Sequence, residues 1–203
     1  MIEIGLFPLG IVLLPTEQLP LHIFEERYKE LIGECIADDS EFALVFADEG
    51  GIREVGTRAR VVQVLTSFPD GRLNIVVEGA ARIRLHELTG GRSYQTGLVT
   101  ALEDEDEAAG DESITRALGL FEQLLELTES ELQLPDARAP QLSYVLAGRV
   151  ELPASDKLDL LGDLSERSRI ERVCSLLARV LEDTRRVRRA AERAVTNGRV
   201  DLG

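Results

Sequence analysis

Cysteine and aromatic residues are scarce in this sequence, and long hydrophobic runs are absent. Tryptophan does not occur and aromatic residues make up 4% of the chain, so we expect a core of Leu, Val, Ile and Ala. The two cysteines, Cys35 and Cys174, are far apart and have no CxxC partner, which disfavours structural zinc and favours a reducing compartment. No apolar run approaches the roughly 18–20 residues that span a bilayer, and no signal peptide opens the chain. We therefore expect a cytoplasmic protein without membrane association.

The charge is strongly negative and unevenly distributed. A formal net charge of −14 disfavours general nucleic-acid binding, because a phosphate backbone would be repelled. Residues 103–136 contain twelve acidic residues against one arginine, whereas residues 165–203 contain ten basic residues against six acidic ones.

The first hundred residues are predicted to form strands around one helix. Leu19, Leu21 and Ile23 alternate with polar residues or proline, which is typical of a half-buried strand. A three- and four-residue spacing then predicts a helix over 25–37, with Phe24, Tyr28, Leu31, Ile32 and Cys35 on its buried stripe. Residues 67–72 contain the Pro-Asp-Gly signal of a hairpin turn. Apolar runs or strands are predicted at 6–9, 11–14, 42–47, 55–66, 73–77, 81–88 and 93–102, with Gly79 as a break. This pattern favours an antiparallel barrel or curled sheet over a parallel βαβ fold.

The remainder is predicted to be helical. Residues 103–107 lack apolar side chains and are expected to form a solvated linker. Helices are predicted around 114–125, 141–149 and 154–161. Asp163 and Glu166 have the spacing of a capping box that would open a long final helix, whose stripe includes Ile170, Cys174 and Leu181. The predicted organisation is therefore a β domain over 1–102, an acidic linker over 103–110 and a helical domain over 111–203, an α+β chain.

Motifs for catalysis are missing from the sequence. Neither lysine follows a glycine, so there is no phosphate-binding loop, and Gly91–Tyr94 lacks the spacing of a nucleophile elbow. His22 and His86 are too far apart for a zincin helix. The two cysteines fall on apolar helical stripes and are interpreted as small buried hydrophobes. We expect no metal and no cofactor.

Several short motifs nevertheless resemble one family in their order. The segments LFPL (6–9), LP (14–15) and LPLHIFEERY (19–28) are similar to the opening of the N-terminal, substrate-binding domain of Lon proteases. The segments VGTRARV (55–61), PDGR (69–72) and VEGAAR (77–82) follow in the family's order, and LP (152–153), LDLL (158–161) and RI (169–170) resemble its helical bundle. Glu26 and Thr16-Glu17 depart from the usual proline and glycine.

The resemblance implies a PUA-like β-barrel followed by a helical bundle, which together form the part of full-length Lon that recognises substrates. In full-length Lon an ATPase and a Ser-Lys peptidase follow, whereas this sequence ends at Gly203. We therefore expect a stand-alone, non-catalytic module that binds unfolded or hydrophobic peptide segments. It would act as an adaptor or regulator in protein quality control, together with a separate protease or chaperone.

Two places could supply an apolar contact surface for such segments. Phe68 and Pro69 lie at the predicted hairpin tip, although Phe68 could instead fold back as packing. The second place contains Pro20 and His22, which should face away from the core, with Phe24 and Tyr28 nearby. Phe24 and Tyr28 also have a core interpretation, and His22 a structural one as a hydrogen-bonding residue.

Two other classes of function stay open. PUA-like barrels occur in RNA-modifying proteins, and Arg185, Arg186, Arg188 and Arg189 of the final helix could contact RNA. The scarcity of aromatic residues and the chain's negative charge count against RNA, and pairing of these arginines with the acidic segment 103–136 of the same or another chain is favoured instead. The third class is an uncharacterised hydrolase.

Overall fold

The computed structural model describes residues 1–105 and 107–197, which divide into two compact units. One, here called the sheet unit, contains residues 1–105 and 144–165. The other, the helical unit, contains residues 107–143 and 166–197. The predicted division at 102–111 therefore differs from the structure for residues 144–165, because this segment returns to pack within the sheet unit.

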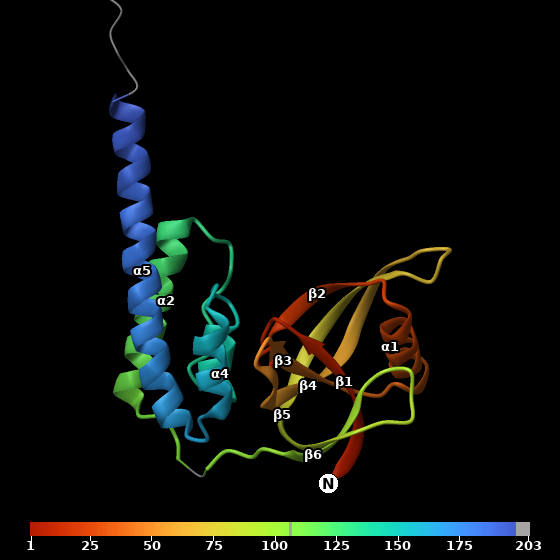
Figure 1. Ribbon diagram of the computed structural model, residues 1–203. Coiled ribbons are helices and arrows are strands. Elements are labelled where there is room, and N and C mark those ends of the chain that lie inside the picture. The colour runs from red at the N-terminus through yellow and green to blue at the C-terminus, as the bar shows by residue number, and fades with distance from the viewer. Residues whose placement is uncertain (106, 198–203) are drawn as a thin grey trace, which may run out of the picture. The chain divides into compact units, whose positions relative to one another are not determined.

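The sheet unit is built on six strands and helix α1, in a mixed sheet (Figure 1). The elements are β1 (Ile2–Leu9), β2 (Gln18–Ile23), α1 (Glu26–Asp38), β3 (Phe42–Asp48), β4 (Gly51–Ser67), β5 (Leu73–Thr89) and β6 (Thr96–Ala101). Their order is β2-β5-β4-β3-β1-β6, and β6 also pairs with β5, which closes a ring. The β-rich expectation is confirmed. One ladder, between β1 and β3, is parallel because β2 and α1 form a crossover between these strands.

Gly79 does not interrupt a strand, contrary to the sequence expectation. A single strand, β5, replaces the two predicted over 73–77 and 81–88. Gly79 lies opposite Ala59 of β4, and a Cβ at this position would collide with the backbone carbonyl of Leu14. The glycine is thus needed for close approach of two backbones. The apolar run over 11–14 is likewise not a strand but a loop, in which Leu13 and Leu14 are buried.

The hairpin predicted around Pro69 is confirmed as the turn between β4 and β5. Gly71 has a φ of +83°, a value that other residues rarely adopt. The Phe68 amide donates to the Arg72 carbonyl at 2.9 Å, and Lys29 Nζ of α1 donates to the Asp70 carbonyl at 2.9 Å. The hairpin projects beyond the rest of the sheet (Figure 1).

Helix α1 matches the predicted helix to within one residue. Tyr28, Leu31, Ile32 and Cys35 form its buried stripe, as expected. Phe24 does not belong to this stripe, because it precedes the N-cap residue Glu25, whose backbone is extended, and its side chain is 59% exposed.

Arg82 links the returning segment to the sheet. Helices α3 (Leu142–Ala147) and α4 (Ala154–Gly162) lie in or at the boundary of this segment. The buried Arg82 guanidinium donates to the carbonyls of Leu161 at 2.9 Å and Asp163 at 2.8 Å, and forms an ion pair with Asp104. The Glu105 amide donates to the Leu164 carbonyl at 2.9 Å. Asp104 and Glu105 therefore contact the sheet unit, although residues 103–105 and 107 are exposed to solvent.

The helical unit consists mainly of two helices that run parallel. α2 (Asp111–Thr128) and α5 (Glu166–Asn197) are in step, since Cys174 Sγ lies 3.5 Å from the Ser113 carbonyl and Arg188 donates to the Leu127 carbonyl at 3.0 Å. The stripe predicted for the final helix is confirmed, because Ile170, Cys174 and Leu181 are buried. Buried residues of both helices include Ala117, Phe121, Leu124, Ile170, Val173, Cys174, Leu177 and Leu181.

The predicted capping box at Asp163 is wrong. α5 begins at Glu166, whose carboxylate accepts hydrogen bonds from the Ser143 amide at 2.9 Å and hydroxyl at 2.6 Å. The same carboxylate pairs with the fully buried Arg169 at 2.6 Å. A tertiary contact therefore holds the side chain that the sequence pattern assigned to a local cap. Every helix in the described ranges is too short or too polar to cross a membrane.

Candidate functional site

Three aromatic rings gather on the surface of the sheet unit, and we call His22, Phe24 and Phe68 the aromatic patch. The His22 and Phe24 rings stack with centroids 5.9 Å apart, and Phe68 meets His22 edge-on at 6.2 Å. Phe24 is 59% exposed, whereas Phe68 is half-buried. Such a cluster is unusual on a monomer surface and marks a candidate contact site.

Strand register explains why residues so distant in sequence meet here. β2 pairs with the first half of β5, which places His22 opposite Asn74, and His22 Nδ1 donates to Asn74 Oδ1 at 2.6 Å. The β4–β5 turn brings Phe68 back to the same end of β5. The Arg72 guanidinium lies 5.0 Å from the centroid of the Phe68 ring and supports it by a cation–π contact.

A small apolar pocket lies beside the patch. Its volume is about 70 Å³, and it is lined by Phe7, Leu9, Leu21, His22, Ile23, Phe24, Glu25 and Tyr28. Tyr28 is 5% exposed, and its ring centroid is 4.1 Å from that of Phe7, so it forms a wall of the pocket. Burial raises the pKa of the Tyr28 hydroxyl. The pocket fits the end of one aliphatic side chain.

The structure brings together only some of the residues that the sequence singled out. His22, Phe24 and Phe68 are in mutual contact, and Tyr28 shares the pocket. Pro20 is exposed on β2 and Pro69 is exposed in the turn. Within the described sheet β2 has β5 as its one neighbour, and Pro20 supplies no amide to the open edge. A partner would therefore contact this surface mainly through side chains.

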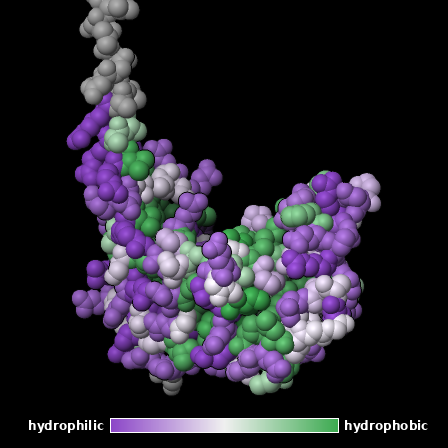
Figure 2. Space-filling model, viewed as in Figure 1, coloured by the Kyte–Doolittle hydropathy of each residue, from purple (hydrophilic) through white to green (hydrophobic). Residues whose placement is uncertain are grey.

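A second apolar surface lies between α1 and β4, and sequence reasoning did not identify it. A groove of about 150 Å³ is lined by Cys35, Ile36, Asp39, Ser40, Arg60, Val61, Val62, Gln63 and Val64. Ile36 and Val64 are each 42% exposed, and the neighbouring Leu65 is 51% exposed. The signal in the sequence was the run VVQVL over 61–65, in which apolar residues are too frequent for simple alternation. Figure 2 shows apolar side chains among polar ones on the projecting hairpin.

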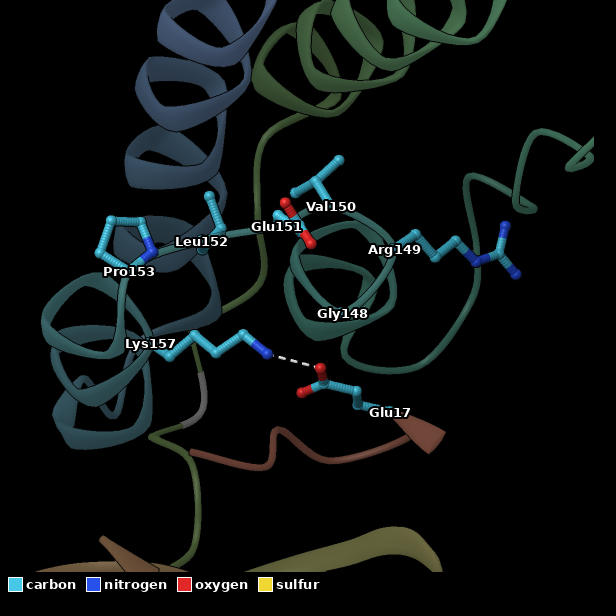
Figure 3. Close-up of a pocket in the computed structure, with 8 residues that line it drawn as sticks. All are labelled: Glu17, Gly148, Arg149, Val150, Glu151, Leu152, Pro153 and Lys157. Atoms are coloured by element: carbon cyan, nitrogen blue, oxygen red, sulfur yellow. Dashed lines mark hydrogen bonds and ion pairs between the residues drawn. The ribbon is translucent and has the colours of Figure 1, made fainter. Parts of the chain in front are cut away.

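A polar cavity of about 680 Å³ was also not expected (Figure 3). Lys157 of α4 pairs with Glu17 at 2.5 Å, and the second carboxylate oxygen of Glu17 accepts the Leu14 amide at 2.9 Å. Backbone and side chains of 148–153 complete the lining. The ammonium and carboxylate neutralise each other, so this cavity presents no free charge from this pair.

The arginines proposed for RNA contacts bind groups of their own helical unit. Arg185 donates to Gln123 at 3.0 Å, and Arg188 donates to the Leu127 carbonyl. Arg186 pairs with Asp183 at 2.5 Å, and Arg189 pairs with Glu182 at 2.8 Å. Arg186 and Arg189 thus pair with acidic residues of α5 itself, not of the segment 103–136, whereas Arg185 and Arg188 contact α2 within that segment.

The remaining titratable candidates are held in ordinary structural contacts. Both cysteines are buried, which raises the pKa of each thiol. His86 Nε2 lies 2.8 Å from the Thr100 hydroxyl. Within the described ranges no group of three or more His, Cys, Asp or Glu side chains is placed to hold a metal ion.

Comparison with known protein families shows to which family the chain belongs. The family of the ATP-dependent protease La (LON) substrate-binding domain matches residues 3–179. The chain belongs to this LON substrate-binding domain family. The resemblance seen in the sequence motifs is thereby confirmed.

LON relatives are similar over most of this chain. The Lon protease of Brevibacillus choshinensis is 29% identical over 192 residues, which cover 86% of this chain and 24% of that protein. The Lon protease of Brucella suis biovar 1 (strain 1330) is 27% identical over 202 residues, which cover 90% of this chain and 25% of that protein. The chain thus spans about a quarter of the length of these relatives.

Solved structures of LON N-terminal domains have the same fold. A Lon N-terminal domain protein from Xanthomonas campestris superposes with a TM-score of 0.69 at 26% identity, over 86% of this chain and 98% of that one. The N-terminal domain of Mycobacterium avium complex Lon protease gives a TM-score of 0.63 at 16% identity, over 87% of this chain and 98% of that one, and this likeness concerns the fold.

Proposed function

We propose that this chain binds exposed hydrophobic or unfolded segments of other proteins and has no catalytic activity of its own. Membership of the LON substrate-binding family supports a role in binding protein substrates. In this proposal the chain acts as an adaptor or regulator in protein quality control and presents captured segments to a separate protease or chaperone.

The aromatic patch is the observation that carries this proposal. The large apolar ring of Phe24 is exposed to solvent, and it lies next to His22 and an apolar pocket. Covering an exposed aromatic ring with another apolar group gains roughly 1–2 kcal/mol from the area removed from water. Aromatic residues that combine area with few rotatable bonds are typical anchors of such interfaces. One hydrophobic side chain of the bound segment would enter the pocket, and the residues next to it in that segment would cover Phe24 and Phe68.

Mutation of the patch tests the proposal directly. Binding of fluorescently labelled casein, a poorly structured protein, is measured by anisotropy at moderate salt with the intact chain. We expect Phe24→Ala to weaken binding about tenfold, the equivalent of about 1.4 kcal/mol, and the added Phe68→Ala change to weaken it further. Leu88→Ala is the matched control, because Leu88 is 49% exposed on β5 but outside the patch.

Three results would contradict the proposal. These are a wild-type chain that binds no unfolded protein, a Leu88→Ala variant that loses as much affinity as Phe24→Ala, and degradation of casein by the purified chain alone. Salt-sensitive RNA binding that disappears on charge reversal of Arg185 and Arg186 would favour the alternative function.

A further inference from the structure

The groove between α1 and β4 is an apolar surface that the aromatic patch does not use. We call Ile36 of α1 with Val62 and Val64 of β4 the aliphatic groove. These three side chains are between 39% and 42% exposed, although each belongs to a residue type that is usually buried. The β4–β5 hairpin, whose β4 arm carries Val62 and Val64, extends past the neighbouring strands (Figure 1).

The geometry of β4 favours side-chain contacts over strand addition at this groove. Pairing between β3 and β4 ends at Phe42 and Ala59, so the described sheet offers β4 only β5 as a neighbour beyond this point. The register between β4 and β5 shifts between Val61 and Gln63 and again between Val64 and Thr66. Such bulges twist an edge and disrupt a regular ladder. An occupant of the groove would therefore bury apolar side chains against Val64 and Ile36.

The rim of the groove is acidic. Arg60 pairs with Glu78 at 2.6 Å, and Arg58 lies 3.1 Å from Glu41, so both basic residues nearby have carboxylate partners. Asp38 and Asp39 are exposed and form no ion pair within the described residues, while Glu78, together with Glu41 and Asp39, raises the pKa of Arg60. With Glu41 and Glu78, carboxylates outnumber Arg58 and Arg60 around the groove. Asp38 and Asp39 lie at the C-terminal end of α1, whose last turn has no basic residue. The helix dipole adds partial negative charge at the same end.

This charge arrangement discriminates between occupants. A second copy of the chain would bring another acidic rim and another net charge of −14 to the groove, which is unfavourable. A segment with lysine or arginine next to its aliphatic residues would instead place a cation beside Asp38, Asp39 and the end of α1.

We propose that the aliphatic groove binds polypeptide segments in which a short aliphatic stretch is flanked by lysine or arginine. This inference rests on the proposed function and adds a second contact surface with its own sequence preference. The aromatic patch accepts hydrophobic segments in general, whereas the groove selects those with basic flanks.

Two labelled peptides with the same Val-Leu-Ile core test the proposal, one flanked by lysines and one by glutamates. Binding to the full chain is measured by anisotropy at low and high salt. The paired change Asp38→Asn and Asp39→Asn removes the rim charge, and Asn tolerates the left-handed backbone of Asp39, whose φ is 48°. Val64→Ser removes apolar area. The matched control is Glu122→Gln with Glu126→Gln, because both are exposed carboxylates on α2 of the helical unit.

We expect the wild-type chain to prefer the lysine-flanked peptide. The Asn variant should bind that peptide about fivefold more weakly than the wild-type chain at low salt and as tightly as the wild-type chain at high salt, since salt screens surface ion pairs. Val64→Ser should weaken it at both salt concentrations, and the α2 control should leave it unchanged.

Each contrary outcome has a distinct meaning. Equal binding of the two peptides by the wild-type chain, or an unchanged affinity in both groove variants, overturns this inference. If Phe24→Ala loses binding while the groove variants do not, this inference fails but the proposed function stands. A wild-type dimer that Val64→Ser dissociates assigns the groove to a second copy and also overturns it. Absence of binding by either peptide and by casein would refute both proposals.

Discussion

Replacement of Arg82 by alanine should destabilise the sheet unit strongly although it leaves the hydrophobic core intact. The Arg82 side chain is 1% exposed and donates to the carbonyls of Leu161 and Asp163 while it pairs with Asp104. Alanine removes all three contacts and leaves two carbonyls and a carboxylate without this partner. The change therefore loosens the returning segment from the strands.

The expected loss of stability follows from burial and charge. Breaking a buried ion pair by removing one member costs about 3–5 kcal/mol. Asp104 is 26% exposed, so water partly replaces the lost guanidinium, and we expect a value near the lower end, about 3 kcal/mol. Against a typical stability of about 5–15 kcal/mol this is a large fraction. It corresponds to a decrease in Tm of roughly 10 °C.

Urea unfolding and thermal denaturation of the full chain measure this effect. Arg84→Ala is the matched control, because Arg84 lies on the same strand but is exposed, and we expect it to change stability by less than about 0.5 kcal/mol. Asp104→Asn should give an intermediate loss. Equal stability of the Arg82→Ala and Arg84→Ala variants would refute the reasoning, as would a fragment ending at Leu102 that folds as stably as the whole sheet unit.

Three further predictions concern buried groups. Burial, together with Glu34, raises the pKa of Tyr94 to about 12, so the folded state favours the neutral phenol. The contribution of this phenol to stability should be complete below about pH 10 and lost as the pH rises towards 12. Ultraviolet titration of the phenol and urea unfolding as a function of pH would show this loss. Cys35 and Cys174 should react with a thiol reagent at pH 8 only on unfolding, and rapid labelling of the native chain would contradict their burial. Phe121→Ala should destabilise the helical unit by about 3–5 kcal/mol in chemical denaturation, and a loss below about 1 kcal/mol would show that the α2–α5 core repacks freely.

Local patterns predicted the elements well where one physical signal dominates. The spacing of Tyr28, Leu31, Ile32 and Cys35 defined α1 to within one residue, and Pro69 with Gly71 defined the hairpin turn. Both signals are local, since each depends on the geometry of a few consecutive residues.

Long-range contacts explain what the sequence could not predict. Gly79 looked like a break because nothing in the sequence indicates that the Leu14 carbonyl approaches it. Glu166 looked like a capping residue, but Ser143 and Arg169 hold its carboxylate. The aromatic patch was anticipated only as two separate places, because the register between β2 and β5 decides that Phe68 meets His22. The aliphatic groove depends on where β3 stops pairing with β4, which no local pattern encodes.

The interleaved order of the two units has a consequence for biosynthesis. Residues 107–143 leave the ribosome before 144–165, the segment that carries the Leu161 and Asp163 carbonyls for Arg82. During translation the Arg82 guanidinium therefore has no access to these two carbonyls until the segment after α2 has been synthesised. α2 is synthesised in the same interval without α5, so its apolar stripe around Phe121 is uncovered on the nascent chain. A nascent-chain chaperone that covers such stripes would meet this polypeptide mainly within that window.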